Sequence, residues 1–191
     1  MPSPAWPVES TRTRPRGLSG FTLIELIVAM SVAGILLAVA VPSFKEVISS
    51  NRETAEVNTL VSALNLARSE AVKRGTPVTL CQSSDGAGCT ADGGYENGWL
   101  VFADPDGDGS VDGGEVILRV SPPLQGNLTL RAEANFAEFV SFLALGTSRG
   151  NGGAGNGNFR LCDSRGAAKA FTVNISNTGR ISSSRGAALC P

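Results

Sequence analysis

A long apolar run near the N-terminus restricts this chain more than any other feature. Residues 21–41 read FTLIELIVAMSVAGILLAVAV, and Glu25 is the only charged residue among them. A helix rises about 1.5 Å per residue, so a run of this length spans the roughly 30 Å of hydrocarbon in a bilayer. A secretory signal peptide is the competing interpretation, but its apolar region covers only about 7 to 15 residues. The sequence therefore predicts a transmembrane helix over residues 21–41.

The charges around and within this run indicate its orientation and raise a question. Arg12, Arg14 and Arg16 precede it, and the positive-inside rule places the short N-terminal tail in the cytoplasm and the rest of the chain across the membrane. An ionised Glu25 inside the bilayer costs about 2.5 to 3.5 kcal/mol on insertion scales. The carboxylate therefore needs a partner, or it must reach the headgroups by snorkelling.

The segment that contains Glu25 carries a family resemblance. Residues 16–26, RGLSGFTLIEL, resemble the leader of type IV prepilins and type II secretion pseudopilins. The resemblance implies that a prepilin peptidase cuts after Gly20, removes residues 1–20 and methylates Phe21. It implies that Glu25 pairs with the N-terminal amine of a neighbouring subunit during assembly. It further implies a single-pass protein of the bacterial inner membrane with a periplasmic C-terminal domain, whose partners are other pilins or pseudopilins, membrane lipid and an inner-membrane assembly platform.

Helical periodicity continues beyond the membrane over residues 42–75. Pro42 removes a backbone donor and is expected to kink or weaken the helix. Two apolar sets then recur at steps of three and four residues on nearly opposite faces. The set expected to face filament neighbours is Phe44, Val47 and Ile48, and the set expected to face the subunit's own sheet is Val57, Leu60, Val61, Leu64, Ala67 and Ala71. Lys73, Arg74 and Gly75 followed by Pro77 are typical of a helix end, so the helix is predicted from about residue 21 to residue 74.

From residue 76 onward, short apolar runs alternate with turn residues, which is typical of strands. The expected strands cover residues 78–81, 98–103, 115–120, 128–130, 138–145, 159–162 and 170–176. Segments 68–71, 75–81 and 98–99 resemble the GspH/FimT (FimU-like) branch of the prepilin family. The resemblance implies an α+β, pilin-like fold in which a long N-terminal helix packs on antiparallel β-sheets, with a periplasmic β-rich head over residues 76–191.

The composition argues against an enzyme. The chain has 191 residues and no His. It therefore lacks the commonest general base and zinc ligand and cannot form a Ser-His-Asp or Cys-His arrangement. We expect a structural or binding protein with no catalytic residues.

Four cysteines lie on the far side of the membrane, in a compartment that permits disulfides. Several connectivities are open, and we prefer the local pairing of Cys81 with Cys89 and of Cys162 with Cys190. A metal site is the alternative, but the cysteines lack CxxC spacing and no His accompanies them.

Residues 104–115, DPDGDGSVDGGE, match the EF-hand loop pattern D-x-[DN]-x-[DN]-G-x₅-E. The candidate calcium ligands are Asp104, Asp106, Asp108, Ser110, Asp112 and Glu115. The flanking runs predict strands instead of the two helices of an EF-hand. A hydrophilic hairpin tip, in which Asp and Gly serve turn chemistry, is the alternative.

The C-terminal part contains a glycine run and an excess of basic residues. Residues 149–158, RGNGGAGNGN, contain a G-x-G-x-x-G without a surrounding βαβ pattern, so we expect a flexible loop there. Residues 145–191 carry six basic side chains and one acid. Some FimT-like relatives bind DNA through a C-terminal Gly-Arg-x-Arg element, whereas this chain has Gly179, Arg180, Ile181 and Ser182 and lacks the second arginine. If DNA binds, Arg165, Lys169, Arg180 and Arg185 are expected to contact phosphates without reading bases.

Two functions are therefore predicted. The favoured one is a minor pilin or pseudopilin, a structural subunit of a type IV pilus or type II secretion pseudopilus that helps to start filament assembly near the tip. The alternative is a DNA-binding minor pilin that takes up extracellular DNA. Calcium is the only cofactor that the sequence suggests.

Overall fold

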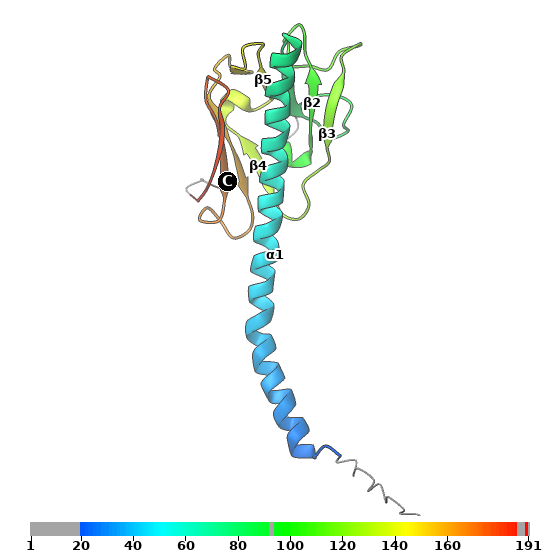
Figure 1. The fold of residues 1–191 in the computed structure, drawn as a ribbon, viewed down its shortest axis with the longest axis vertical. Helices are drawn as coiled ribbons and strands as arrows, with labels where there is room; N and C mark the ends of the chain where they lie inside the picture. The colour runs from blue at the N-terminus through cyan, green and yellow to red at the C-terminus, as the bar shows by residue number, and fades with distance from the viewer. Residues whose placement is uncertain (1–19, 92–93, 187–189, 191) are drawn as a thin grey trace, which may run out of the picture. The chain divides into compact units, whose positions relative to one another are not determined.

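The computed structural model describes residues 20–91, 94–186 and 190, and the chain divides into two compact units. The first unit ends at Glu46 and the second begins at Val47. One helix, α1 (Leu23–Arg74), contributes to both units, and the described strands all belong to the second (Figure 1). The predicted leader, residues 1–20, lies outside the described residues except for Gly20.

In the first unit, α1 begins at a polar cap and exposes apolar side chains. The Glu25 N–H donates to Thr22 Oγ1 at 3.3 Å, so Thr22 satisfies one of the free N–H groups of the first turn. The large apolar side chains of residues 21–44 are exposed by between 49% at Val41 and 84% at Phe21. The helix is long and apolar enough to cross a membrane, and it continues through Pro42.

In the second unit, two antiparallel sheets pack on the C-terminal half of α1 (Figure 1). The five-stranded sheet has the order β3-β2-β1-β5-β6, and the four-stranded sheet has the order β4-β7-β8-β9. The strands are β1 (Val78–Gln82), β2 (Trp99–Ala103), β3 (Ile117–Ser121), β4 (Thr129–Ala132), β5 (Phe139–Phe142), β6 (Ser148–Gly150), β7 (Gly157–Cys162), β8 (Phe171–Ile175) and β9 (Ile181–Arg185). Two short 3₁₀ helices, η1 (Tyr95–Asn97) and η2 (Ala134–Phe136), precede β2 and β5. The predicted α+β fold class is confirmed.

The core of this unit lies between α1 and the inner faces of the two sheets. Side chains of α1 that are buried there are Val57, Leu60, Ala63, Leu64, Ala67 and Ala71, with Val61 partly buried beside them. They form one cluster with Leu80 and Val101 of the first sheet and with Phe159 and Val173 of the second. The sheet-facing set predicted from periodicity is therefore confirmed. The predicted outward set, Phe44, Val47 and Ile48, is exposed by 67%, 52% and 58%.

The seven predicted strands are present, and two further strands were not predicted. β6 and β9 have the sequences SRG and ISSSR, in which Ile181 is the only β-branched or aromatic residue of the kind that marks strands in a sequence. They pair antiparallel with β5 and β8, so tertiary contact supplies what local propensity does not. β5 ends at Phe142, earlier than predicted, because the Leu143 N–H donates to the Thr147 carbonyl and the Gly146 N–H to the Leu143 carbonyl, which forms a turn.

The prediction of a flexible loop over residues 149–158 was wrong at its ends. Gly150 lies in β6, and Gly157 begins β7. A Cβ atom at Gly150 would collide with the Asn135 carbonyl oxygen, and one at Gly155 would collide with the Ser148 carbonyl oxygen. These glycines permit close approach of backbone segments.

Two loops, one after β1 and one between β2 and β3, cover the outer face of the five-stranded sheet. The Cys81–Cys89 disulfide, Leu100, Phe102 and Phe139 form a second apolar cluster there. Val111 packs against it from residues 104–115 between β2 and β3, which we call the acidic loop. The second disulfide joins Cys162 at the end of β7 to Cys190 near the C-terminus. Both bonds are those of the local pairing preferred from the sequence.

Candidate functional site

Glu25 lies in the first turn of α1 with its side chain exposed. A negative charge is favourable at this end of a helix because the first N–H groups give it a partial positive charge. In the described part of the chain, no cationic side chain forms an ion pair with the Glu25 carboxylate.

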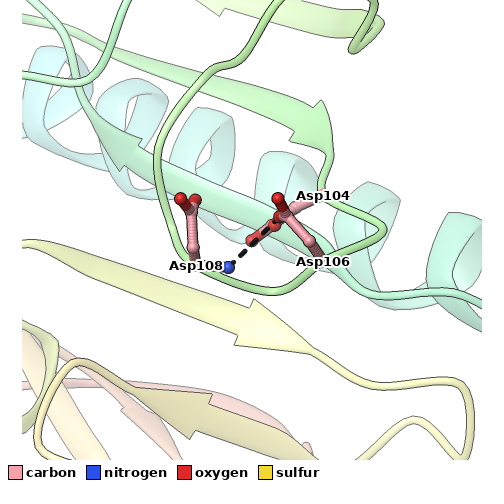
Figure 2. A group of neighbouring side chains, drawn as sticks. All are labelled: Asp104, Asp106 and Asp108. Atoms are coloured by element: carbon pink, nitrogen blue, oxygen red, sulfur yellow. Dashed lines mark hydrogen bonds between the residues drawn. The ribbon is translucent and has the colours of Figure 1, made fainter.

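The acidic loop between β2 and β3 brings three carboxylates together. Figure 2 shows Asp104, Asp106 and Asp108 around one bend of the loop, and one ligand oxygen of each lies within 4.8 Å of the others. The bend is built from Asx-type hydrogen bonds. The Asp108 N–H donates to Asp106 Oδ1 at 3.4 Å, and the Ser110 N–H donates to Asp108 Oδ1 at 2.7 Å. The spacing that resembles an EF-hand thus produces a real cluster, although strands flank it.

Asp104 also holds this loop to the sheet. Its side chain is fully buried and accepts hydrogen bonds from the Gly107 N–H at 2.7 Å, the Gly109 N–H at 3.2 Å and Thr79 Oγ1 at 2.5 Å. Burial raises the pKa of Asp104, and these hydrogen bonds oppose the rise. The hydrogen bonds show that Asp104 has a structural role that requires no cation.

The remaining predicted ligands do not join the three aspartates. Glu115 Oε2 accepts a hydrogen bond from the Asp112 N–H at 3.0 Å. Asp112 and Glu115 line a shallow concavity with Asp106, on a different side of the loop from the pocket that Asp108 and Ser110 line. The close group of ligand oxygens thus consists of Asp104, Asp106 and Asp108, and Asp112 and Glu115 lie beside it around the concavity that they share with Asp106.

A polar cluster that the sequence analysis missed lies where α1 meets the β7–β8 loop. Glu53 on α1 is fully buried, and its Oε2 lies 2.6 Å from Arg165 Nη2. Arg165 Nε lies 2.5 Å from Asp163 Oδ2, which also accepts a hydrogen bond from Ser49 Oγ at 3.1 Å. Burial raises the pKa of Glu53, and the Arg165 guanidinium opposes that rise. The cluster connects α1 to a loop that contributes little apolar surface.

The sequence contained a signal for this cluster. Glu53 precedes Val57 by four residues and Leu60 by seven, so it continues the buried stripe of α1 toward the N-terminus. A charged residue on an apolar stripe indicates a buried ion pair, although its partner, Arg165, is far away in the sequence.

The basic residues considered for DNA binding lie at different places in the head. Arg165 and Arg185 both approach Glu53, and Arg185 also lies 4.4 Å from the Phe171 ring centre and donates to Ser50 Oγ at 2.9 Å. Arg180 is exposed on the turn before β9, at the opposite end of that strand from Arg185. Lys169 is exposed on the β7–β8 loop. Arg165 and Arg185 are thus engaged within the head.

Comparison with known families decides what kind of protein this is. The model of the family described as type II transport protein GspH matches residues 56–179, which is more than half of the chain. The chain belongs to the GspH family. The prokaryotic N-terminal methylation motif also matches this GspH chain, over residues 16–41, which contain Gly20, Phe21 and Glu25. Both resemblances predicted from the sequence are confirmed.

Two solved crystal forms of one pilin show the same fold. This GspH-family chain is similar to the type IV minor pilin FimU from Pseudomonas aeruginosa, with a TM-score of 0.53 and 23% identity over 69% of this chain and 87% of that one. Another crystal form of FimU gives a TM-score of 0.51 and 22% identity over 69% and 91%. The minor pseudopilin EpsH of the Vibrio cholerae type 2 secretion system gives 0.49 and 12% over 70% and 97%.

Family membership establishes the general character of the protein. Members of the GspH family are structural pilin or pseudopilin subunits, not enzymes, and such subunits form filaments with other subunits. The methylation motif followed by an apolar helix is that of a single-pass inner-membrane protein with a periplasmic domain.

The Glu53–Arg165 pair gives a testable effect on stability. Replacing Arg165 by Met leaves a buried carboxylate without its closest cation and is expected to lower the free energy of unfolding by about 3 kcal/mol at neutral pH. Because the folded-state pKa of Glu53 is raised, this group favours folding most when protonated and loses that contribution as the pH rises. The deficit of Arg165→Met should therefore shrink in acid, which urea unfolding at neutral and acidic pH measures.

The matched control is Arg165→Met combined with Glu53→Gln, which removes the buried charge as well. The double variant should lose less stability than Arg165→Met, and its loss should change less with pH, because only the pairing of Arg165 with Asp163 still contributes to it. If Arg165→Met costs the same free energy of unfolding in the wild type and in the Glu53→Gln variant, this account is contradicted.

Proposed function

We propose that this GspH-family chain is a minor pilin or pseudopilin that enters a filament near its tip and helps to initiate assembly. The observation that carries the proposal is Glu25, an exposed carboxylate in the first turn of an apolar helix. In lipid such a group is costly while unpaired. Pairing with the N-terminal amine of a neighbouring subunit removes this cost, so the same charge that is unfavourable in a separate subunit favours contact between two.

Processing is part of the proposal. A prepilin peptidase cuts after Gly20 and methylates Phe21, which creates the amine with which Glu25 of a neighbour pairs. Residues 1–20 are then lost, residues 21–41 remain in the membrane, residues 42–75 continue the helix, and residues 76–191 form the periplasmic head. An inner-membrane assembly platform receives the processed subunit. The match to the N-terminal methylation motif supports this sequence of steps.

The assembly role is tested by replacing Glu25 with Val. Glu25→Val should insert into the membrane as well as the wild type, because an apolar residue carries no desolvation cost there, but should enter filaments about tenfold less. The measurement compares the amounts of the chain in the membrane fraction and in sheared filaments. Glu25→Asp keeps the charge and is the control expected to assemble closer to the wild type. Equal incorporation of Glu25→Val and wild type would refute the proposal.

DNA binding is the second candidate function. The exposed side chains of Arg180 and Lys169 support it, because phosphate contacts require cations that reach the solvent. Arg165 and Arg185 are less suited, since using them for DNA would withdraw cations from the buried Glu53.

A gel-shift titration at several salt concentrations tests this second function. If DNA binds, Arg180→Ala combined with Lys169→Ala should weaken binding for all sequences alike and reduce the salt slope by about 2. Arg119→Ala, in which the change lies on β3 and removes a contact with Ser62, is the control. Absence of binding by the wild type, or equal binding by the double variant, would exclude the function.

We also propose that the acidic loop binds Ca²⁺. The grouping of Asp104, Asp106 and Asp108 supports this, because Ca²⁺ takes several oxygen ligands at about 2.3 to 2.6 Å and relieves the repulsion among close carboxylates. Asp104 fixes one side of the group, and Asp106 and Asp108 are exposed.

Calorimetric titration of the protein with CaCl₂ tests the calcium proposal. We expect a dissociation constant of about 10⁻⁴ to 10⁻³ M, which is typical of extracellular calcium modules. Asp106→Asn with Asp108→Asn should abolish the heat while keeping the structural contacts of Asp104, and Glu133→Gln is the control for loss of a distant carboxylate. If the double variant binds calcium as well as the wild type does, these aspartates are not the ligands.

A further inference from the structure

The outer edge of the four-stranded sheet is formed by β9, and its backbone groups on that side have no partner in the described chain. The Ser176 N–H donates to the Arg180 carbonyl at 3.0 Å, and the Gly186 N–H donates to the Ala170 carbonyl at 2.8 Å. In an antiparallel pair, hydrogen-bonded positions alternate. The register of β8 with β9 therefore directs the backbone N–H and C=O groups of Ser182 and Ser184 toward β8. The N–H and C=O groups of Ile181, Ser183 and Arg185 point away from the sheet.

The other edge strands are protected. On β4, the outward N–H of Leu130 donates to Glu96 Oε2 at 3.2 Å, and Glu96 is paired with Arg131. On β6, the outward N–H groups of Ser148 and Gly150 donate to the carbonyls of Asn177 and Ala154. The pairing of β3 with β2 is interrupted by a register shift, which disfavours continued strand addition.

β9 has none of these protective devices among its described residues. Its five residues pair with β8 in continuous register, and Ser182, Ser183 and Ser184 are exposed. Natural edge strands are usually blocked by Lys, Pro or a bulge, because an open edge is a template for another strand. The small serine side chains allow a second backbone to approach, and the polar pairs of Ser182 with Asn174 and Ser184 with Thr172 keep the surface from being apolar.

β9 is held to α1 near both of its ends. The turn before β9 receives a hydrogen bond from Arg68 of α1 at the Thr178 carbonyl, and Arg185 at its other end donates to Ser50 of α1. β9 therefore runs beside α1 within the head (Figure 1).

We propose that β9 is a docking edge on which an extended acidic segment of a neighbouring filament subunit adds a fifth strand to the four-stranded sheet. The main-chain groups of Ile181, Ser183 and Arg185 supply the hydrogen bonds, as in other cases of β-strand addition. The exposed Arg180 at the start of the edge, and the absence of any carboxylate within β9, favour carboxylates on the incoming segment. This inference rests on the proposed role as a filament subunit.

Ser183→Pro in the full chain, expressed in cells that assemble the filament, is the main test. Proline removes the outward N–H of residue 183 and no hydrogen bond to β8, so the head should fold while strand addition is blocked. We expect about tenfold less of the variant in sheared filaments at an unchanged membrane level. Ser183→Ala keeps the N–H and is the matched control, expected to assemble like the wild type. If Ser183→Pro fails to accumulate, Ser183→Lys, which blocks the edge and keeps the backbone intact, replaces it as the deciding variant.

The occupant is identified with Ser183→Cys, because the four native cysteines are paired and the new thiol is the only free one. A thiol-directed photo-crosslinker placed there should give an adduct with a segment of a different filament subunit, identified by mass spectrometry. An adduct only with a second copy of this chain or with DNA, or wild-type incorporation of the edge-blocked variant, would overturn the inference. Failure of the proposed function itself is recognised separately, because Glu25→Val would then also assemble normally.

Discussion

The packing of α1 against both sheets is the contact on which the rest of the head depends. Each fully buried Leu or Val on this stripe contributes about 1.5 to 3 kcal/mol. Ala63, Ala67 and Ala71 contribute less area but let the strands approach the helix closely. The two sheets share this one helix face and bury a single apolar cluster with it. Each sheet therefore needs the other to keep that cluster out of water. The large apolar side chains of α1 before Val47 are exposed, which suits a lipid environment.

Two loops with little apolar surface are held by a common arrangement. Each is anchored by a fully buried carboxylate and lies near a disulfide. Asp104 ties the acidic loop to β1 through Thr79, close to the Cys81–Cys89 bond. Glu53 ties the β7–β8 loop to α1 through Arg165, and the Cys162–Cys190 bond closes the chain beside that loop. A buried carboxylate is costly by itself, so each of these contacts depends on donors from a segment distant in the sequence.

This arrangement leaves contact surfaces of different chemistry on one subunit. The exposed part of α1 up to Phe44 is apolar and carries a single acid near its start, which suits contact between helices in lipid. The edge of β9 is polar and offers backbone hydrogen bonds, which suits contact between heads in water. A subunit with both kinds of surface can join its neighbours at two levels of a filament. The engagement of Arg165 and Arg185 with Glu53 explains why the basic end of the chain is in part a structural feature.

The sequence alone determined the elements whose signals are local. The apolar run with Glu25, the stripe from Val57 to Ala71, the helix end at Gly75 and seven strands were all predictable, because helix and strand periodicity record which face is buried. The grouping of Asp104, Asp106 and Asp108 followed from their spacing, since alternate residues of a tight turn lie close together.

Only the tertiary structure decided the features that join distant segments. β6 and β9 form because β5 and β8 provide partners for sequences with low strand propensity. Glu53 forms an ion pair with Arg165, which is more than half of the chain away in the sequence, and no local pattern specifies that pair. The orientation of the β9 backbone groups depends on register, which the turn between β8 and β9 sets. Periodicity reports what a segment buries, whereas pairing depends on which other segment the fold brings to it.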